Sequence, residues 1–187
     1  MRCAHPGTGH GGFSLRCRPA GSDPLSNPAN AGVTIWVDGD SCPVPVRDLL
    51  LRAARRGVAT VIFCARQGLP LPGDVTDCVE MRLVRDVTVD EYLLERVGSA
   101  GTLVVTRDIP LAEELLERGV AVMNDRGRLF ERDSIRELRS LRDAAAAIRA
   151  QGLEQMNSAV TYGKREQKAF ADALDRFLAR PGRSATG

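Results

Sequence analysis

The sequence predicts an α/β fold of three layers, in which a central and mostly parallel sheet of about five strands lies between helices. The first observation behind this prediction is that short apolar segments alternate with amphipathic segments from residue 33 onward. The second is that the apolar segments "VTIWV" (33–37) and "TLVVT" (102–106) are continuous runs, which are typical of strands buried on both faces. Alternation of this kind with short loops favours parallel strands joined by helical crossovers.

The first half of the alternation begins with the strand at 33–37. The helix predicted at 43–57 has prolines only at its start, and Gly57 marks its end. Two further apolar segments, at 58–64 and 78–84, are predicted strands.

The second half repeats the pattern with a short helix at 89–97, the strand at 102–106, a helix at 110–119 and a strand at 120–124. Two longer helices are predicted to follow this sheet, at 134–152 and 164–180. Ser134 is the expected N-cap of the first, because Glu137 follows three residues later as in a capping box.

We expect one folded domain over residues 33–180. Residues 1–32 are rich in Gly, Pro, Ser and Asn and lack periodicity, so this extension and the tail at 181–187 are expected to be disordered. Cysteine and histidine spacing in the extension does not match a closed zinc site, and the five cysteines of the chain do not suggest a disulfide framework. With no apolar run of about 18 residues and no signal-like segment, we expect a cytoplasmic protein with no membrane partner.

Charge is unevenly distributed along the chain. Residues 33–125 carry 10 basic and 15 acidic side chains, whereas residues 126–187 carry 13 basic and 8 acidic ones. An acidic body beside a basic C-terminal region suits a cation site next to a surface that attracts phosphates, although solvated helix faces give the same pattern. Aromatic residues make up only 4% of the chain, which disfavours stacking platforms for single-stranded nucleic acid.

Acidic residues follow several of the predicted strands. Asp38 ends the first strand and Asp40 comes just after it, Asp108 follows the strand at 102–106, and Asp90 begins the helix after the third strand. The carboxyl ends of parallel strands meet at one edge of a sheet, where open α/β folds bind their ligands. Clustered carboxylates suit Mg²⁺ or Mn²⁺, which accept oxygen ligands and assist phosphate chemistry.

Helix capping is the alternative interpretation of these acids. Asp40, Asp90 and Asp108 each lie at a predicted helix start, where a carboxylate accepts backbone N–H bonds. Asp38 is the hardest to explain as a cap because it directly ends a strand. A nucleophilic Cys42 is disfavoured, since both histidines lie in the N-terminal extension and no Cys–His pair is available in the domain.

Three segments together resemble the YaiI/YqxD family of uncharacterised bacterial proteins. They are "IWVDGDSCPV", "VVTRDIPLAEELLERGVAVMNDRG" and "KREQKAFADALDRFL", and the resemblance covers about residues 33–178. It departs from the family pattern at Gly39, where D-A-D is usual, and in "VTVDEY", where the family usually has D-A-A-D-D-W.

The resemblance implies a PIN-like fold, a group that includes many metal-dependent nucleases. It implies that Asp38 and Asp108, and less directly Asp40 and Asp90, hold Mg²⁺ or Mn²⁺, with Asp38, Asp90 and Asp108 as the catalytic acids. Thr106 would orient the Asp108 loop. The residues expected to contact metal-bound water or phosphate are Asn124, Arg126, Lys164 and Arg165.

Three functions remain open at this stage. The first is a Mg²⁺- or Mn²⁺-dependent nuclease acting on RNA or another nucleic acid. The second is a phosphatase of the haloacid-dehalogenase type, with Asp38 as nucleophile and Asp40 as general acid, but the required lysine and late acidic pair are missing from the expected places. The third is a non-catalytic binding module whose acids cap helices.

Overall fold

The structure is a computed structural model of the 187-residue chain. It describes residues 33–72, 77–98, 101–150 and 162–180, with the side chains of 145–150 left aside. The predicted disorder of residues 1–32 and 181–187 lies outside the described residues, so those domain boundaries stay predictions.

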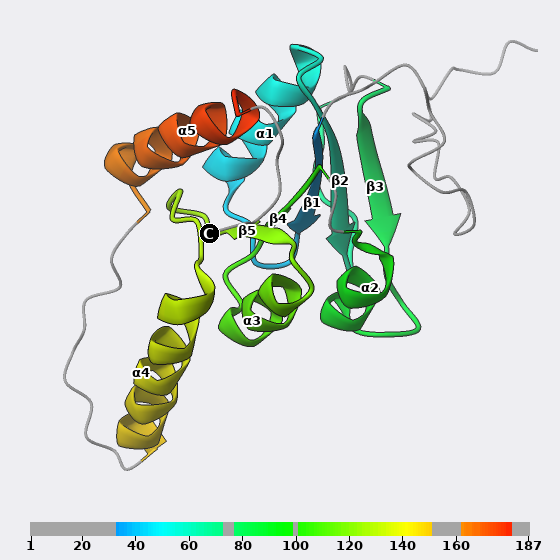
Figure 1. The fold of residues 1–187 in the computed structure, drawn as a ribbon. Helices are drawn as coiled ribbons and strands as arrows, with labels where there is room; N and C mark the ends of the chain where they lie inside the picture. The colour runs from blue at the N-terminus through cyan, green and yellow to red at the C-terminus, as the bar shows by residue number, and fades with distance from the viewer. Residues whose placement is uncertain (1–32, 73–76, 99–100, 151–161, 181–187) are drawn as a thin grey trace, which may run out of the picture.

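Every predicted helix and strand is present, with ends that shift by at most two residues. The elements are β1 (Val33–Asp38), α1 (Val44–Arg55), β2 (Ala59–Ala65), β3 (Val79–Leu83), α2 (Val89–Arg96), β4 (Thr102–Val105), α3 (Ile109–Glu117), β5 (Ala121–Met123), α4 (Arg132–Ala150) and α5 (Lys164–Leu178) (Figure 1).

The sheet has the strand order β3-β2-β1-β4-β5, and every neighbouring pair is parallel. The chain builds outward from β1 to β2 and β3, then returns to the other side of β1 with β4 and β5. The topological switch point therefore lies between β1 and β4, and ligands of open α/β sheets bind beyond the carboxyl ends of such strands.

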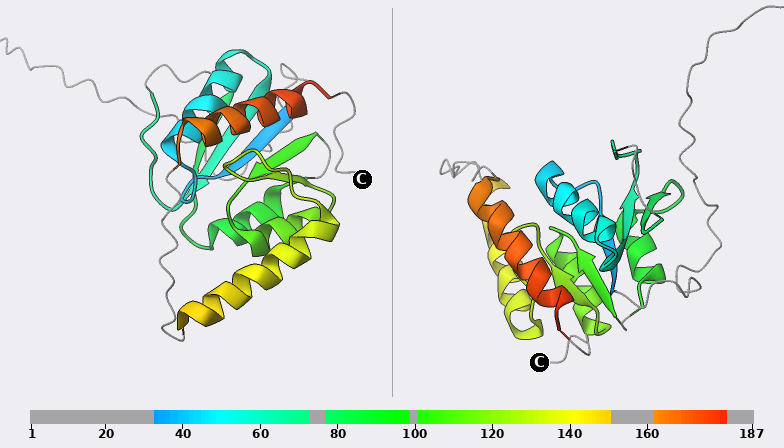
Figure 2. Two further views of the ribbon diagram at one scale, coloured as in Figure 1. Left: turned by 90° about the vertical axis from the view of Figure 1, so that its left-hand side faces the viewer. Right: turned by 90° about the horizontal axis from the view of Figure 1, so that it is seen from above.

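Helices cover both faces of the sheet, which confirms the predicted three-layer α/β fold (Figures 1 and 2). Alternate strand residues divide between two apolar clusters, as the two-residue period of a strand requires. In β1, Ile35 and Val37 pack in the cluster with α1 and α5, whereas Trp36 packs with α2 and α3. Asp38 is therefore directed toward the α2 and α3 side, because it lies two residues after Trp36.

The start of α4 differs from the prediction. The helix begins at Arg132 rather than after Ser134, because the Ile135 N–H already bonds to the Glu131 carbonyl at 3.0 Å. Arg132 Nε also donates to the Leu116 carbonyl at the end of α3, which holds this first turn in place. Ser134 is not the N-cap: its hydroxyl group donates back to the Glu131 carbonyl.

In the part of the chain that the structure describes, no helix combines the length and the apolar character that crossing a bilayer requires.

Candidate acidic site at the ends of β1 and β4

Asp38 is a buried carboxylate at the end of β1, with 6% of its surface exposed. The Ser41 hydroxyl group donates to its Oδ2 atom at 2.7 Å, and the Thr106 hydroxyl group donates to the same atom at 3.1 Å. Within the described residues, no donor reaches Oδ1. One oxygen is therefore held in place by the protein, and the other can accept a ligand.

Asp108 is tied to the same arrangement through Thr106. Its backbone N–H donates to the Thr106 hydroxyl oxygen at 3.0 Å. Its Oδ1 atom accepts from the Leu111 N–H at 3.1 Å, so Asp108 is the N-cap of α3, as the capping interpretation held. Capping occupies one carboxylate oxygen and leaves Oδ2 with no donor among the described residues.

Asp90 lies in the first turn of α2 but does not cap it. Thr88 is the N-cap, and its side chain and that of Glu91 form a capping box. The half-buried Asp90 carboxylate has no hydrogen-bond partner in the described ranges. Burial raises its pKa above the ordinary value of 3.8, and the nearby charges of Asp108 and Asp38 raise it further.

Asp40 has a structural contact of its own. The register pairs Asp38 with Cys64, so Asp40 comes level with Arg66, just past the end of β2. Both Asp40 carboxylate oxygens accept from the Arg66 backbone N–H at 3.2 Å. Asp40 does not cap α1, because Pro43 is the N-cap and forms no side-chain cap bond. Neither Asp40 nor Asp90 is therefore an N-cap, although Asp90 keeps a place in the first turn of α2, where its charge complements the helix dipole.

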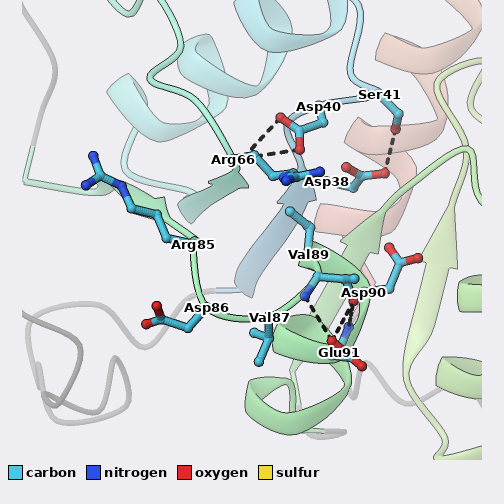
Figure 3. A pocket seen from close by; sticks show the side chains of 11 residues that line it. Asp38, Asp40, Ser41, Arg66, Arg85, Asp86, Val87, Val89, Asp90 and Glu91 are labelled. Atoms are coloured by element: carbon cyan, nitrogen blue, oxygen red, sulfur yellow. Dashed lines mark hydrogen bonds between the residues drawn. The ribbon is translucent and has the colours of Figure 1, made fainter.

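Asp38, Asp40 and Asp90 border a cleft of about 600 Å³, which we call the acidic cleft. Figure 3 shows Asp38 and Asp40 on its β1 side, with Asp90 and Glu91 across from them on α2. Arg66 and Arg85 also line the cleft. Asp108 is outside the lining, although its charge acts on Asp90.

The donor set suits a hard cation, but it is not a closed cage. Among the described residues, no three His, Cys, Asp or Glu side chains lie together as ligands of a single ion. Mg²⁺ commonly uses only one or two carboxylates and keeps several waters, which a substrate phosphate can replace. The free Oδ1 atom of Asp38 and the unpartnered carboxylate of Asp90 fit that open kind of site.

Asn124 and Arg126 lie in a turn after β5 and line neither this cleft nor the second one described below. The Asn124 Oδ1 atom accepts from the backbone N–H groups of Arg126 and Arg128 at 3.0 and 2.9 Å. The Tyr162 hydroxyl group donates to the carbonyl oxygen of Asp125, which ties this turn to the start of α5. These contacts give the Asn124 side chain a structural role in the turn.

Lys164 and Arg165 form the exposed first residues of α5 and also line neither cleft. The structure therefore does not bring the predicted phosphate contacts at 124, 126, 164 and 165 to the acidic cleft.

Several residues of the acidic cleft were not predicted from the sequence, and Ser41, Arg66 and Arg85 are among them. Arg66 and Arg85 follow the ends of β2 and β3, at the same edge of the sheet as Asp38. The site predicted from the strand ends did not include these two arginines. Ser41 lies three residues after Asp38, close enough for a turn to join the two side chains.

Comparisons with known proteins agree on one family. The family model described as "Uncharacterized BCR, YaiI/YqxD family" matches residues 36–180. A UPF0178 protein of Psychromonas ingrahamii is 37% identical over 147 residues, which cover 78% of this chain and 95% of that protein. A UPF0178 protein of Treponema denticola is 39% identical over 148 residues, covering 78% and 92%. No solved structure gives a significant match.

Proposed function

The chain belongs to the uncharacterised YaiI/YqxD family, and from its acidic cleft we propose that it is a Mg²⁺- or Mn²⁺-dependent nuclease that hydrolyses phosphodiester bonds in RNA. One observation carries the proposal. The carboxylates of Asp38, Asp90 and Asp108 come from three separate elements to the switch point of a parallel sheet, and none forms a salt bridge within the described residues.

Like charges gathered in this way are unfavourable unless a cation offsets them. The Asp90 carboxylate is half-buried and has neither a donor nor a basic partner in the described residues, because Thr88 and Glu91 form the capping box of α2 without it. A divalent ion at the cleft supplies the chemistry of hydrolysis, since it lowers the pKa of a bound water and offsets the charge of the reacting phosphate.

The protein's own groups would position the ion and the substrate. Ser41 and Thr106 fix one oxygen of Asp38 and thereby orient the other toward the cleft. Arg66 and Arg85 line the same cleft and supply positive charge for a phosphate group. Asp40, bound to the Arg66 backbone, keeps the turn after β1 in register with the end of β2.

A phosphatase that uses Asp38 as nucleophile is less well supported. That chemistry calls for a lysine beside the nucleophile, and no lysine lines either cleft among the described residues. Asp40, the general acid in that scheme, has both oxygens on the Arg66 backbone N–H.

The proposal is tested by cleavage of mixed RNA and DNA substrates with Mg²⁺, with Mn²⁺ and with EDTA. We expect metal-dependent cleavage of RNA, and a loss of at least about 100-fold in Asp38→Asn, as is typical when a group that stabilises the transition state is removed. Asp48→Asn is the matched control, because Asp48 is an exposed acid on α1 outside the cleft.

A binding measurement runs beside the cleavage assay. Paramagnetic Mn²⁺ should broaden the amide signals of residues around Asp38, Asp90 and Asp108 in the wild type and in Asp48→Asn, but not in Asp38→Asn. Absence of both Mn²⁺ binding and cleavage would refute the nuclease and favour a non-catalytic binding module. Trapping of a phosphoryl group on Asp38 would favour the phosphatase instead.

A further inference from the structure

A second cleft, of about 640 Å³, lies beside the turn that carries Asp40. It is bordered by that turn, by the start of α1 and by the segment after β2, and Arg47 lines it together with Arg66 and Gln67. We call it the arginine cleft. Asp40 and Arg66 line both clefts, so they form a common wall between the acidic cleft and the arginine cleft.

Arg47 is the unusual feature of this second cleft. Its Nε and Nη1 atoms are buried and have no hydrogen-bond partner among the described residues. Burying donors of a charged group without partners is costly, and such groups are rare in folded proteins. Because Arg47 also lines the cleft, an anionic ligand there would offset its charge, and a small movement of the guanidinium group would bring the two buried donors within reach of the ligand's oxygens.

The other charges of the cleft also favour an anion. Arg66 adds a second guanidinium group, and it forms no salt bridge with any described carboxylate. Among the described residues of the lining, Asp40 is the one acid, and both its oxygens already accept from the Arg66 backbone N–H. Helix α1 begins beside the cleft with no acidic residue in its first turn and no side-chain cap, so its dipole contributes further positive potential.

We propose that Arg47 and Arg66 bind a phosphate group of the nucleic-acid strand, next to the phosphate that lies in the acidic cleft. A guanidinium fork matches phosphate oxygens in geometry and charge. Because the two clefts share a wall, a strand passing over Asp40 and Arg66 would place neighbouring phosphates in the two clefts. The identity of the ligand rests on the proposed nuclease function, whereas the phosphate site itself rests on the arginines.

The experiment measures binding by the full chain in EDTA, so that neither metal nor turnover is involved. The probes are inorganic phosphate and a diribonucleotide with and without a 5′-phosphate, followed by NMR chemical shifts. We expect the phosphorylated form to bind more tightly in the wild type. Arg47→Met should weaken the binding of inorganic phosphate and of the phosphorylated form about tenfold or more, because each charge-assisted hydrogen bond contributes on that scale.

Two further variants separate the effect of the Arg47 fork from the effects of charge and of position on α1. Arg47→Lys retains the positive charge but lacks the planar guanidinium fork. It should therefore bind phosphate more weakly than the wild type and more tightly than Arg47→Met. Arg52→Met is the matched control, because Arg52 is exposed on the same helix and lines neither cleft. Removing buried donors that lack partners should also leave the thermal midpoint of Arg47→Met equal to or above that of the wild type, which separates lost binding from lost folding.

The proposal is overturned if Arg47→Met binds phosphate as tightly as the wild type, or if the 5′-phosphate adds no affinity in the wild type. The nuclease function is judged separately, by cleavage. A chain that binds the phosphorylated dinucleotide through Arg47 but cuts no RNA would refute the nuclease and leave the phosphate site standing. In an active nuclease, Arg47→Met should raise KM with little change in kcat.

Discussion

The Thr106 hydroxyl group donates a hydrogen bond to Asp38 Oδ2 at 3.1 Å, although the two residues are 68 positions apart in the chain. Thr106 is almost fully buried, and its oxygen also accepts from the Asp108 backbone N–H. A single hydroxyl group thus links the end of β1 to the start of α3 and fixes two of the three acids of the candidate site.

We therefore expect Thr106→Val to destabilise the protein by about 1–3 kcal/mol, because a side chain of similar shape leaves the Asp108 N–H without its acceptor. Thr106→Ser keeps the hydroxyl group and should retain most of the stability, losing about 0.8 kcal/mol for the methyl group. Urea unfolding of the two variants measures the difference. Equal free energies of unfolding for Val and Ser would show that this bond contributes little.

The Asp90 carboxyl group should make stability depend on pH in metal-free protein. Burial, and then the charges of Asp108 and Asp38, raise its pKa above 3.8, so the folded state binds this proton more tightly than the unfolded state. Stability from this group is present at low pH and is lost as pH rises through the raised pKa. Asp90→Asn should then be more stable than the wild type at neutral pH, with the advantage vanishing below about pH 3.8.

Urea unfolding in EDTA across this pH range checks the prediction, with Asp48→Asn as the control for removing an exposed acid. An NMR titration of the Asp90 carboxyl group adds a direct readout. Its pKa should fall in Asp38→Asn, because one of the charges that raises it is gone. A stability difference between Asp90→Asn and the wild type that is constant with pH would contradict this account.

The fold could be predicted from the sequence because its signals are local. Unbroken apolar runs such as 33–37 marked buried strands, and Gly57 marked the end of a helix, where the structure gives it a positive φ. The start of α4 was misplaced because the capping pattern at Ser134 was locally valid. The contact that decides it, from Arg132 to the end of α3, joins residues 16 positions apart in the chain.

The candidate site was only partly predictable, because it too depends on contacts between residues far apart in the chain. Asp38 and Asp108 could be predicted as site residues because each follows a strand, and a parallel sheet brings the carboxyl ends of its strands to one edge. Which acid has a structural contact and which is free for a ligand depends on contacts between distant parts of the chain. The bond between Asp40 and the Arg66 backbone is one such contact, and spacing in the sequence does not reveal it. The Thr88 capping box was legible in "TVDE" and could have shown that Asp90 is not needed as a cap.

Cys42 should be unreactive in the folded protein despite its place before α1. Burial raises the pKa of its thiol to about 12, and the charge of Arg47 lowers it too little to compensate. At pH 8 only about one thiol in 10,000 is then ionised, against about one in ten for a thiol of pKa 9.0. Iodoacetamide labelling followed by peptide mass spectrometry should show Cys42 modified roughly 1,000-fold more slowly in native protein than in urea. Comparable rates in both states would instead support a nucleophilic role.

Gly127 and Gly57 form a matched pair for testing how tightly the turn after β5 packs on α5. Both have positive φ, 79° and 70°, so alanine is strained at either position. At Gly57 an added Cβ meets no atom of the described residues within 4 Å, whereas at Gly127 it would lie 2.5 Å from the Ala169 carbonyl oxygen, a backbone atom that cannot rotate away. Gly57→Ala should therefore cost about 1–2 kcal/mol, the backbone strain alone.

Gly127→Ala should cost clearly more, above about 3 kcal/mol, because the turn or α5 must also move. Urea unfolding of both variants at neutral pH gives the comparison, with the wild type as reference. If the turn moves, the Tyr162 bond to the Asp125 carbonyl should weaken as well, and NMR shifts of residues 124–128 and 162–170 would report it. Similar costs for the two substitutions would mean that α5 yields to the added methyl group, and that this contact does not hold the C-terminal helix against the sheet.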